Sequence, residues 1–200
     1  MSRFIFTVII ALMSMTATAK SIVVLGDSIS AGYGIEVAQG WVALLQKKLD
    51  EQGAGHIIHN ESISGDTTGG GLARIDQALS LHKPSVVIVE LGANDGLRGL
   101  LPTLIKSNLA DIIHRAQSTG AKVLLLSMKI PPNYGQRYIT VFYNIYPQLA
   151  AELGVQTVPF IMEDVALSKA LMQQDGLHPN AQGQPVIADK VWTQMLPLLK

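Results

Sequence analysis

The strongest constraint on this chain is a set of short, uninterrupted apolar segments separated by stretches of helical periodicity. The clearest of these segments are residues 21–25, 85–91 and 122–126, which are rich in valine, isoleucine and leucine. Continuous apolar runs of this length are typical of strands buried on both faces of a parallel sheet. Residues 57–63 and 155–158 are weaker strand candidates. Together they predict a mainly parallel sheet of about five strands.

Helical periodicity fills the intervals between these strands. Apolar side chains recur at three- and four-residue spacing within residues 41–49, 101–113, 142–153 and 187–198. Alternating strands and amphipathic helices are the pattern of a three-layer α/β/α sandwich. Because such sheets bind ligands at the carboxyl ends of their strands, we expect the functional residues in the loops that follow the strands.

The N-terminus has the features of an export signal. Arg3 precedes an apolar run over residues 4–15, and Ala17 and Ala19 supply the small residues of a cleavage site. The run is shorter than the roughly 20 residues that a membrane-spanning helix needs. We therefore expect residues 1–19 to be a cleaved signal peptide, residues 20–200 to form one domain, and the protein to be periplasmic or secreted. A retained N-terminal anchor is the alternative.

Charge and cysteine content limit the possible partners. Without Arg3, the chain carries 14 lysines and arginines against 15 aspartates and glutamates. This balance argues against nucleic acid and anionic membranes as partners, since both require a basic surface. Once the signal peptide is cleaved, we expect no stable membrane insertion. Cysteine is absent, so the fold has no disulfide. We expect no metal or cofactor, since no zinc, calcium or phosphate-loop motif occurs. We also expect a monomer.

Four polar segments follow predicted strands or lie near the C-terminus. The first three contain Ser28, Gly65 and Asn94, and the fourth contains Asp175 and His178 in the order Asp-Gly-Leu-His-Pro. Ser28 taken alone also fits an ordinary turn, because glycine, aspartate and serine are common in turns. Four such segments at one edge of a sheet indicate an active site instead.

In this order the segments resemble the four conserved blocks of the SGNH (GDSL-like) hydrolases. Residues 133–138 and 175–180 are similar in particular to the periplasmic thioesterase I and lysophospholipase branch and to bacterial arylesterases. The one departure is Ile29, which replaces a leucine and alters local packing rather than polarity. The resemblance implies a flavodoxin-like fold and an oxyanion hole formed by the N–H groups of Ser28 and Gly65 and the side-chain amide of Asn94.

The chemistry of the residues is consistent with this resemblance. A serine hydroxyl is a poor nucleophile until a base removes its proton, and His178 is the candidate base for Ser28. Asp175 lies three residues earlier in a loop containing glycine, so its carboxylate could orient the imidazole. These roles predict acyl transfer to water through an acyl-enzyme.

Apolar residues near the predicted strand ends indicate the kind of substrate. We expect an apolar acyl chain to be bound by Leu97, Leu100, Ile130, Pro131, Tyr134 and Phe142. The predicted substrate is a small-molecule acyl ester or thioester. A carbohydrate O-deacetylase on the same fold is an alternative, although two tryptophans offer few sugar platforms. A non-catalytic acyl-lipid binding module is another, and hydrolysis of peptides also stays open.

Overall fold

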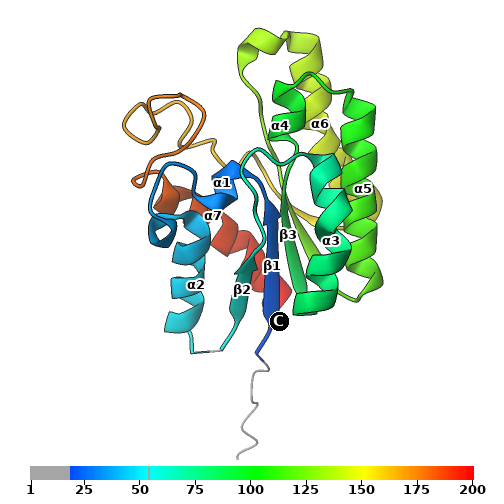
Figure 1. Ribbon diagram of the computed structural model, residues 1–200, viewed down its shortest axis with the longest axis vertical. Helices are drawn as coiled ribbons and strands as arrows, with labels where there is room; N and C mark the ends of the chain where they lie inside the picture. The colour runs from blue at the N-terminus through cyan, green and yellow to red at the C-terminus, as the bar shows by residue number, and fades with distance from the viewer. Residues whose placement is uncertain (1–18, 54) are drawn as a thin grey trace, which may run out of the picture.

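The computed structural model describes residues 19–53 and 55–200 and contains one parallel sheet (Figure 1). Its strands are β1 (Ser21–Gly26), β2 (Ile57–Asn60), β3 (Val86–Glu90), β4 (Lys122–Leu126) and β5 (Gln156–Val158), in the order β2-β1-β3-β4-β5. Strand β1 lies next to the edge strand β2 and pairs with both β2 and β3, so that Val24 lies between Asn60 and Ile88. The prediction of a parallel sheet with about five strands is confirmed.

Helices cover both faces of this sheet. They are α1 (Ser28–Ala31), α2 (Trp41–Glu51), α3 (Thr68–His82), α4 (Ala93–Leu97), α5 (Pro102–Ser118), α6 (Gln136–Leu153) and α7 (Gln184–Met195), with short 3-10 helices η1 (Val37–Gln39), η2 (Pro132–Tyr134) and η3 (Leu196–Leu199). Helices α2 and α7 pack together on one side, and α3, α5 and α6 pack together on the other (Figure 1). The predicted three-layer α/β/α sandwich is therefore confirmed.

Burial explains which strands were easy to predict. Every residue of β3 is buried, and so are most residues of β1 and β4, because helices cover both faces. The edge strand β2 is only partly buried, and it ends at Asn60 rather than at residue 63 as expected. Beyond Asn60 the chain still runs beside β1, since the Glu61 N–H donates to Val24 O at 2.9 Å and the Ile63 N–H donates to Gly26 O at 3.1 Å. Edge strands are less apolar, so their boundaries are harder to read from hydrophobicity.

Three consecutive glycines lie in the first turn of α3, close to the end of β3. A Cβ added to Gly71 would lie 2.3 Å from Leu91 Cδ1, so any larger residue here would displace the Leu91 side chain. Thr67 caps the helix, since its side chain accepts a hydrogen bond from the Gly70 N–H at 3.2 Å. The result is a helix that begins directly behind the loop joining it to β2.

The expected signal peptide falls almost wholly on residues 1–18, outside the described residues. Within the part that the structure describes, no helix is both long and apolar enough to cross a membrane. The described chain begins beside its own end, where Lys20 Nζ donates to Leu199 O at 2.6 Å.

Candidate active site

Ser28 stands at the carboxyl end of β1. It is the first residue of the short helix α1, and the N-cap residue Asp27 accepts a hydrogen bond from the Ile29 N–H at 3.0 Å. The chain turns tightly here because Gly26 has no side chain. A Cβ added to Gly26 would lie 2.7 Å from the Ser30 side chain and 2.8 Å from Ser62 Oγ. The turn presents the Ser28 hydroxyl at the sheet edge where ligands bind in open α/β folds.

His178 and Asp175 reach Ser28 from the opposite end of the chain. The imidazole Nε2 lies 2.9 Å from Ser28 Oγ, and Nδ1 lies 2.6 Å from Asp175 Oδ2. The other carboxylate oxygen, Oδ1, accepts hydrogen bonds from the N–H groups of Leu177 and His178 at 2.9 and 3.0 Å. One carboxylate therefore folds the loop and orients the imidazole, which is the geometry of a nucleophile, a base and an orienting acid.

The charge of Asp175 is stabilised by these same hydrogen bonds. Partial burial acts to raise the pKa of Asp175, but the His178 N–H, the imidazole and the Leu177 N–H outweigh it and lower the pKa to about 2. Asp175 is thus ionised throughout the neutral range. An ionised carboxylate against Nδ1 favours the tautomer that leaves Nε2 free to accept the Ser28 proton.

Gly65 and Asn94 lie on the two loops that flank Ser28. Gly65 follows β2 and has a φ of +81°, a conformation that favours glycine. Among the described residues, neither the Ser28 nor the Gly65 N–H donates to a protein acceptor. Asn94 Nδ2 donates to Asp27 Oδ2 at 3.0 Å and to Asp66 O at 2.9 Å. Both amide hydrogens therefore have protein partners, and Asn94 can contact an oxyanion only by sharing or redirecting one of them.

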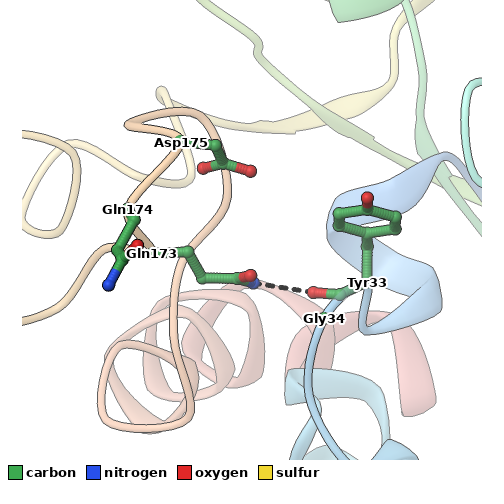
Figure 2. Close-up of a pocket in the computed structure, with 5 residues that line it drawn as sticks. All are labelled: Tyr33, Gly34, Gln173, Gln174 and Asp175. Carbon is green, nitrogen blue, oxygen red and sulfur yellow. Dashed lines mark hydrogen bonds between the residues drawn. The ribbon is translucent and has the colours of Figure 1, made fainter.

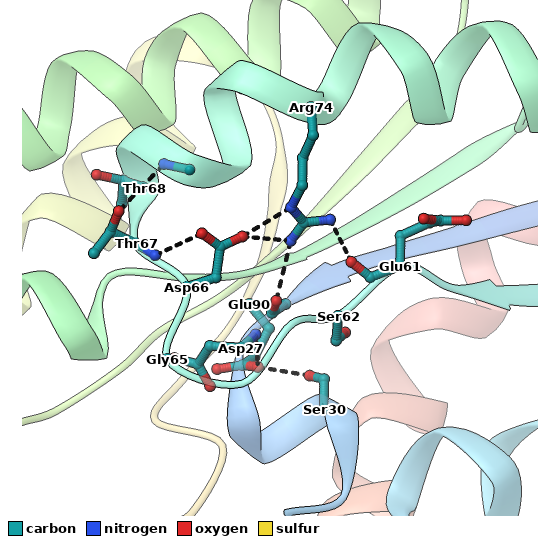
Figure 3. A network of polar contacts seen from close by, with 12 residues as sticks. Asp27, Ser30, Glu61, Ser62, Gly65, Asp66, Thr67, Thr68, Arg74 and Glu90 are labelled. Carbon is teal, nitrogen blue, oxygen red and sulfur yellow. Dashed lines mark hydrogen bonds and ion pairs between the residues drawn. The ribbon is translucent and has the colours of Figure 1, made fainter.

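Two carboxyl groups are buried directly beneath the nucleophile, and the sequence analysis did not identify them as a pair. Glu90 Oε2 accepts hydrogen bonds from Ser30 Oγ at 2.6 Å and from the Asp27 N–H at 3.2 Å (Figure 3). Burial raises the pKa of Asp27 to about 6 and raises the pKa of Glu90 well above its usual value. A glutamate inside the otherwise apolar run 86–91 was the available sequence signal.

An apolar pocket of about 390 Å³ opens beside Ser28, Asn94 and His178. Three of the residues expected to bind the acyl chain line it, namely Leu97, Ile130 and Pro131. The sequence analysis missed much of the remaining lining, which includes Met128, Phe160, Met162, Ala166, Leu167, Met172 and Leu177. Most of these residues follow β4 and β5. The expectation that ligands bind at the carboxyl ends of the strands located Ser28 and could also have identified these residues.

Leu100, Tyr134 and Phe142 do not line this pocket, contrary to expectation. Phe142 is fully buried in α6, where a Cβ added to Gly96 would lie 2.9 Å from its ring. The Tyr134 hydroxyl donates to Leu97 O at 2.8 Å, and the Leu100 carbonyl accepts from the Tyr138 hydroxyl at 2.6 Å. The tyrosine hydroxyls supply donors to the carbonyl groups of this loop, and Phe142 packs against it at Gly96, so these residues support the pocket wall rather than line it.

A second, open groove lies on the other side of the loop that carries His178. Its lining residues are Tyr33, Gly34, Gln173, Gln174 and Asp175 (Figure 2). Residues 173–175 line this groove and residues 176–178 line the apolar pocket, so the loop forms the boundary between them. Tyr33 packs against the imidazole of His178 with ring centroids 4.6 Å apart. The sequence analysis did not predict this groove.

Comparisons with known proteins agree with this geometry. Residues 24–186 match the model of the GDSL-like lipase/acylhydrolase family. The chain is 47% identical to "Esterase TesA" of Pseudomonas aeruginosa over 190 residues, which cover 95% of this chain and 94% of the relative. It is 43% identical to "Thioesterase 1/protease 1/lysophospholipase L1" of Escherichia coli K12 over 194 residues, which cover 97% and 92% of the two chains.

Among solved structures, the crystal structure of TesA superposes with a TM-score of 0.87 and 47% sequence identity. The match covers 90% of this chain and 99% of that chain. The resemblance to SGNH hydrolases inferred from the four sequence blocks is therefore confirmed at the level of both sequence and fold.

Proposed function

The chain belongs to the GDSL-like lipase/acylhydrolase family, and from this premise we propose that it is a serine hydrolase of carboxylic esters and acyl thioesters. The observation that carries the proposal is the continuous chain of hydrogen bonds from Asp175 through His178 to Ser28 at the mouth of an apolar pocket. Relatives named as an esterase and as a thioesterase and lysophospholipase support the same reaction class.

The first half of the proposed reaction transfers the acyl group to Ser28. The Ser28 oxygen attacks the acyl carbon while its proton passes to His178 Nε2, which is 2.9 Å away. The tetrahedral intermediate then breaks its bond to the leaving oxygen or sulfur. His178 returns the proton to that leaving group, and Asp175 stabilises the imidazolium while it exists. The products of this step are a free alcohol or thiol and an ester on Ser28.

Hydrolysis of the acyl-enzyme completes the proposed cycle. Water gives a proton to His178 Nε2 as its oxygen attacks the ester carbon, and the second tetrahedral intermediate releases the carboxylic acid. Ser28 then regains its proton from His178. Every proton transfer uses the same nitrogen, His178 Nε2, so a single base serves both halves of the reaction.

The oxyanion of both intermediates needs hydrogen-bond donors. We assign this role to the N–H groups of Ser28 and Gly65, which have no protein acceptor among the described residues, and to Asn94. The amide of Asn94 is preoriented by Asp27 and Asp66 and would share one of its hydrogens with the oxyanion. Preoriented donors of this kind stabilise developing charge without reorganisation during the reaction.

The pocket favours an acyl chain over a sugar. Its wall is mainly methionine, leucine, isoleucine, proline and phenylalanine, and neither Trp41 nor Trp192 lines it. A carbohydrate O-deacetylase would need polar and flat aromatic surfaces there, so that alternative is less well supported. A non-catalytic lipid-binding module would not require a base held between a serine and a carboxylate.

We also propose that residues 1–19 are removed on export and that residues 20–200 act as one catalytic domain outside the cytoplasm. The basic residue, apolar run and small residues at the N-terminus support this proposal. N-terminal sequencing of the mature protein tests it, with Lys20 expected as the first residue and Met1 or Ser2 as the contradicting result.

Turnover of chromogenic acyl esters and acyl thioesters by purified protein tests the function. We expect wild-type protein to hydrolyse both, and Ser28→Ala to bind fatty acid but to hydrolyse neither at a rate above background. Fatty-acid binding by the wild type without serine-dependent turnover would instead identify a binding module. Release of acetate from acetylated sugars without turnover of longer acyl esters would identify a deacetylase.

A further inference from the structure

The groove beside His178 has the position that the leaving group of a substrate requires. In the proposed reaction the acyl chain enters the apolar pocket, and His178 protonates the leaving atom. The leaving group must therefore extend away from that pocket while remaining close to the imidazole. The groove of Tyr33, Gly34, Gln173, Gln174 and Asp175 satisfies both requirements, since it begins across the 173–178 loop from the pocket (Figure 2).

Tyr33 is the aromatic surface of this groove. Its side chain is 53% exposed although its ring packs against the His178 imidazole at 4.6 Å. The backbone beneath it is held in place, because Gln173 Nε2 donates to Tyr33 O at 2.7 Å and to Pro179 O at 3.1 Å. An exposed ring on an anchored backbone next to the proton donor is suited to stack on a planar leaving group.

The charge of the groove discriminates between classes of leaving group. Among the described residues that line it there is no cation, and Asp175 contributes a carboxylate with a lowered pKa. Phosphate-bearing leaving groups such as coenzyme A gain nothing from such a surface and are repelled by Asp175. We propose that this groove binds the leaving group, and that Tyr33 and the missing cation give uncharged aryl alcohols an advantage over anionic leaving groups.

The proposal rests on the proposed function, and substrates that share one acyl group separate the two. Phenyl butanoate and hexafluoroisopropyl butanoate form the same acyl-enzyme and have leaving groups of similar basicity, but only one is aromatic. We expect Tyr33→Leu to lower kcat/KM for the phenyl ester relative to the fluoroalkyl ester by about 3- to 10-fold, the range of one aromatic contact. Tyr33→Phe keeps the ring and should keep the ratio.

A charge variant tests the second half of the proposal. Gln174→Lys adds a cation to the groove and should raise kcat/KM for butanoyl-coenzyme A several-fold at low salt, with no gain at high salt. Gln52→Lys is the matched control, because it adds the same charge at an exposed position after α2, on another side of the molecule. It should leave both thioester and ester rates unchanged.

The outcomes are distinguishable. Equal losses on both butanoate esters in Tyr33→Leu would show that Tyr33 supports His178 without binding the leaving group. A gain with Gln52→Lys equal to that of Gln174→Lys would show general steering rather than a site. Absence of any butanoate hydrolysis by the wild type would instead overturn the proposed function itself.

A separate observation concerns Arg74, which joins the end of β1 to the loop that carries Gly65 (Figure 3). Its Nε and Nη2 donate to Asp66 Oδ2 at 2.8 and 2.7 Å, and Nη2 also donates to Gly26 O at 3.2 Å. A third nitrogen, Nη1, donates to Glu61 O. The Arg74 and Asp66 side chains are only 17% and 11% exposed, so this ion pair is shielded from solvent and salt.

This guanidinium is connected to every segment that carries a proposed oxyanion donor. Gly26 leads into Ser28, and Asp66 directly follows Gly65. Asp66 O accepts the Asn94 amide at 2.9 Å. We infer that Arg74 is a positioning residue that holds the oxyanion donors in register, since its planar group with several donors binds the end of β1 and both ends of the 61–66 loop at once.

A transition-state readout separates this role from a purely structural one. We expect Arg74→Met to lower kcat by about 10- to 100-fold with KM changed by less than about twofold, because the donors act on the intermediate. Affinity for an acyl boronate, which mimics that intermediate, should fall in parallel, while affinity for the product fatty acid stays the same. Arg74→Lys should restore only part of kcat.

The control is Arg115→Met on α5, which breaks the exposed pair between Arg115 and Asp76 of α3. It should leave kcat and boronate affinity unchanged. If Arg74→Met does not fold, Asp66→Asn gives the same comparison, because the amide keeps an oxygen acceptor but removes the charge. A folded variant with unchanged kcat, or with boronate and fatty-acid affinities reduced equally, would overturn the inference.

Discussion

The site contains three carboxyl groups, and the environment of one has the opposite effect on its pKa from the environments of the other two. Asp175 accepts three hydrogen bonds and has a pKa lowered to about 2. Asp27 and Glu90 lie beneath Ser28, and burial raises the pKa of both. These opposite pKa shifts suit different roles. An ionised Asp175 can stabilise an imidazolium, whereas a protonated Glu90 can remain in a dry site beside another carboxyl group.

Replacement of Asp175 should be less damaging than replacement of His178. Asp175→Asn removes the charge that orients the imidazole, and we expect kcat to fall by roughly 10²- to 10⁴-fold. His178→Ala removes the base itself and should lower kcat further. Measurement of kcat for both variants on one aryl ester checks the order. A fully active Asp175→Asn enzyme would remove Asp175 from the catalytic mechanism.

Glu90 provides a prediction about stability and pH. Its pKa in the folded protein is well above its usual value of 4.5, so from about pH 4.5 upward the unfolded chain releases a proton that the folded chain retains. The stability contributed by the protonated group is therefore lost as pH rises toward the folded pKa. Glu90→Gln cannot ionise and should gain stability over the wild type, by a few degrees in Tm, between about pH 4 and pH 8.

The control for this prediction is Glu51→Gln, an exposed glutamate at the end of α2. Its Tm difference from the wild type should not depend on pH in this way. A Glu90→Gln variant whose Tm difference is constant from about pH 4 to pH 8 would show that Glu90 titrates normally in the folded protein.

Site residues that lie in short sequence motifs were predictable from the sequence, whereas a contact that depends on how two strands pair was not. Ser28 and His178 lie in short segments with recognisable residue types, and the structure brings them within 2.9 Å. The pairing of Asp27 with Glu90 follows from the register of β1 and β3, in which Gly26 lies opposite Glu90. Nothing local in either segment gives that register.

At the scale of elements, the loops after β4 and β5 form much of the acyl pocket. The sequence indicated which strands exist, but apolar side chains near a strand end can either line a cavity or support its wall. Ile130 does the first, while Phe142 does the second because α6 packs behind the α4 segment. Only the direction of the helix decides between these roles, and hydrophobic periodicity does not specify it.

Leu97 at the end of α4 tests the assignment of the pocket. Leu97→Ala removes side-chain contact but keeps the carbonyl group that accepts the Tyr134 hydroxyl. We expect kcat/KM to fall by about 10-fold or more for acyl chains long enough to reach Leu97, and hardly at all for acetyl esters. The measurement is kcat/KM across a series of acyl lengths.

The matched control is Leu104→Ala on α5, where the leucine is 48% exposed and outside the pocket. It should not alter the dependence on acyl length. Equal losses at every length for Leu97→Ala would exclude Leu97 from the acyl-binding surface.

At the scale of the whole molecule, sheet topology brings the site together. All strands are parallel in the order β2-β1-β3-β4-β5, so their carboxyl ends share one edge. This edge unites Ser28 with His178, which is 150 positions away in sequence. A covered parallel sheet has few registers compatible with its buried faces, which is why the fold and the convergence of the polar segments were predictable together.

The central claim is that Ser28, activated by His178, is the nucleophile of this fold. Reaction with a fluorophosphonate, followed by intact mass and peptide mass spectrometry, tests it most directly, because the reagent traps an activated serine covalently. The account predicts one adduct per chain, located on Ser28, with labelling greatly slowed in His178→Ala and abolished in the unfolded protein. An adduct on Ser30 or Ser64, or ester hydrolysis that continues at full rate in fully labelled wild-type protein or in Ser28→Ala, would contradict it.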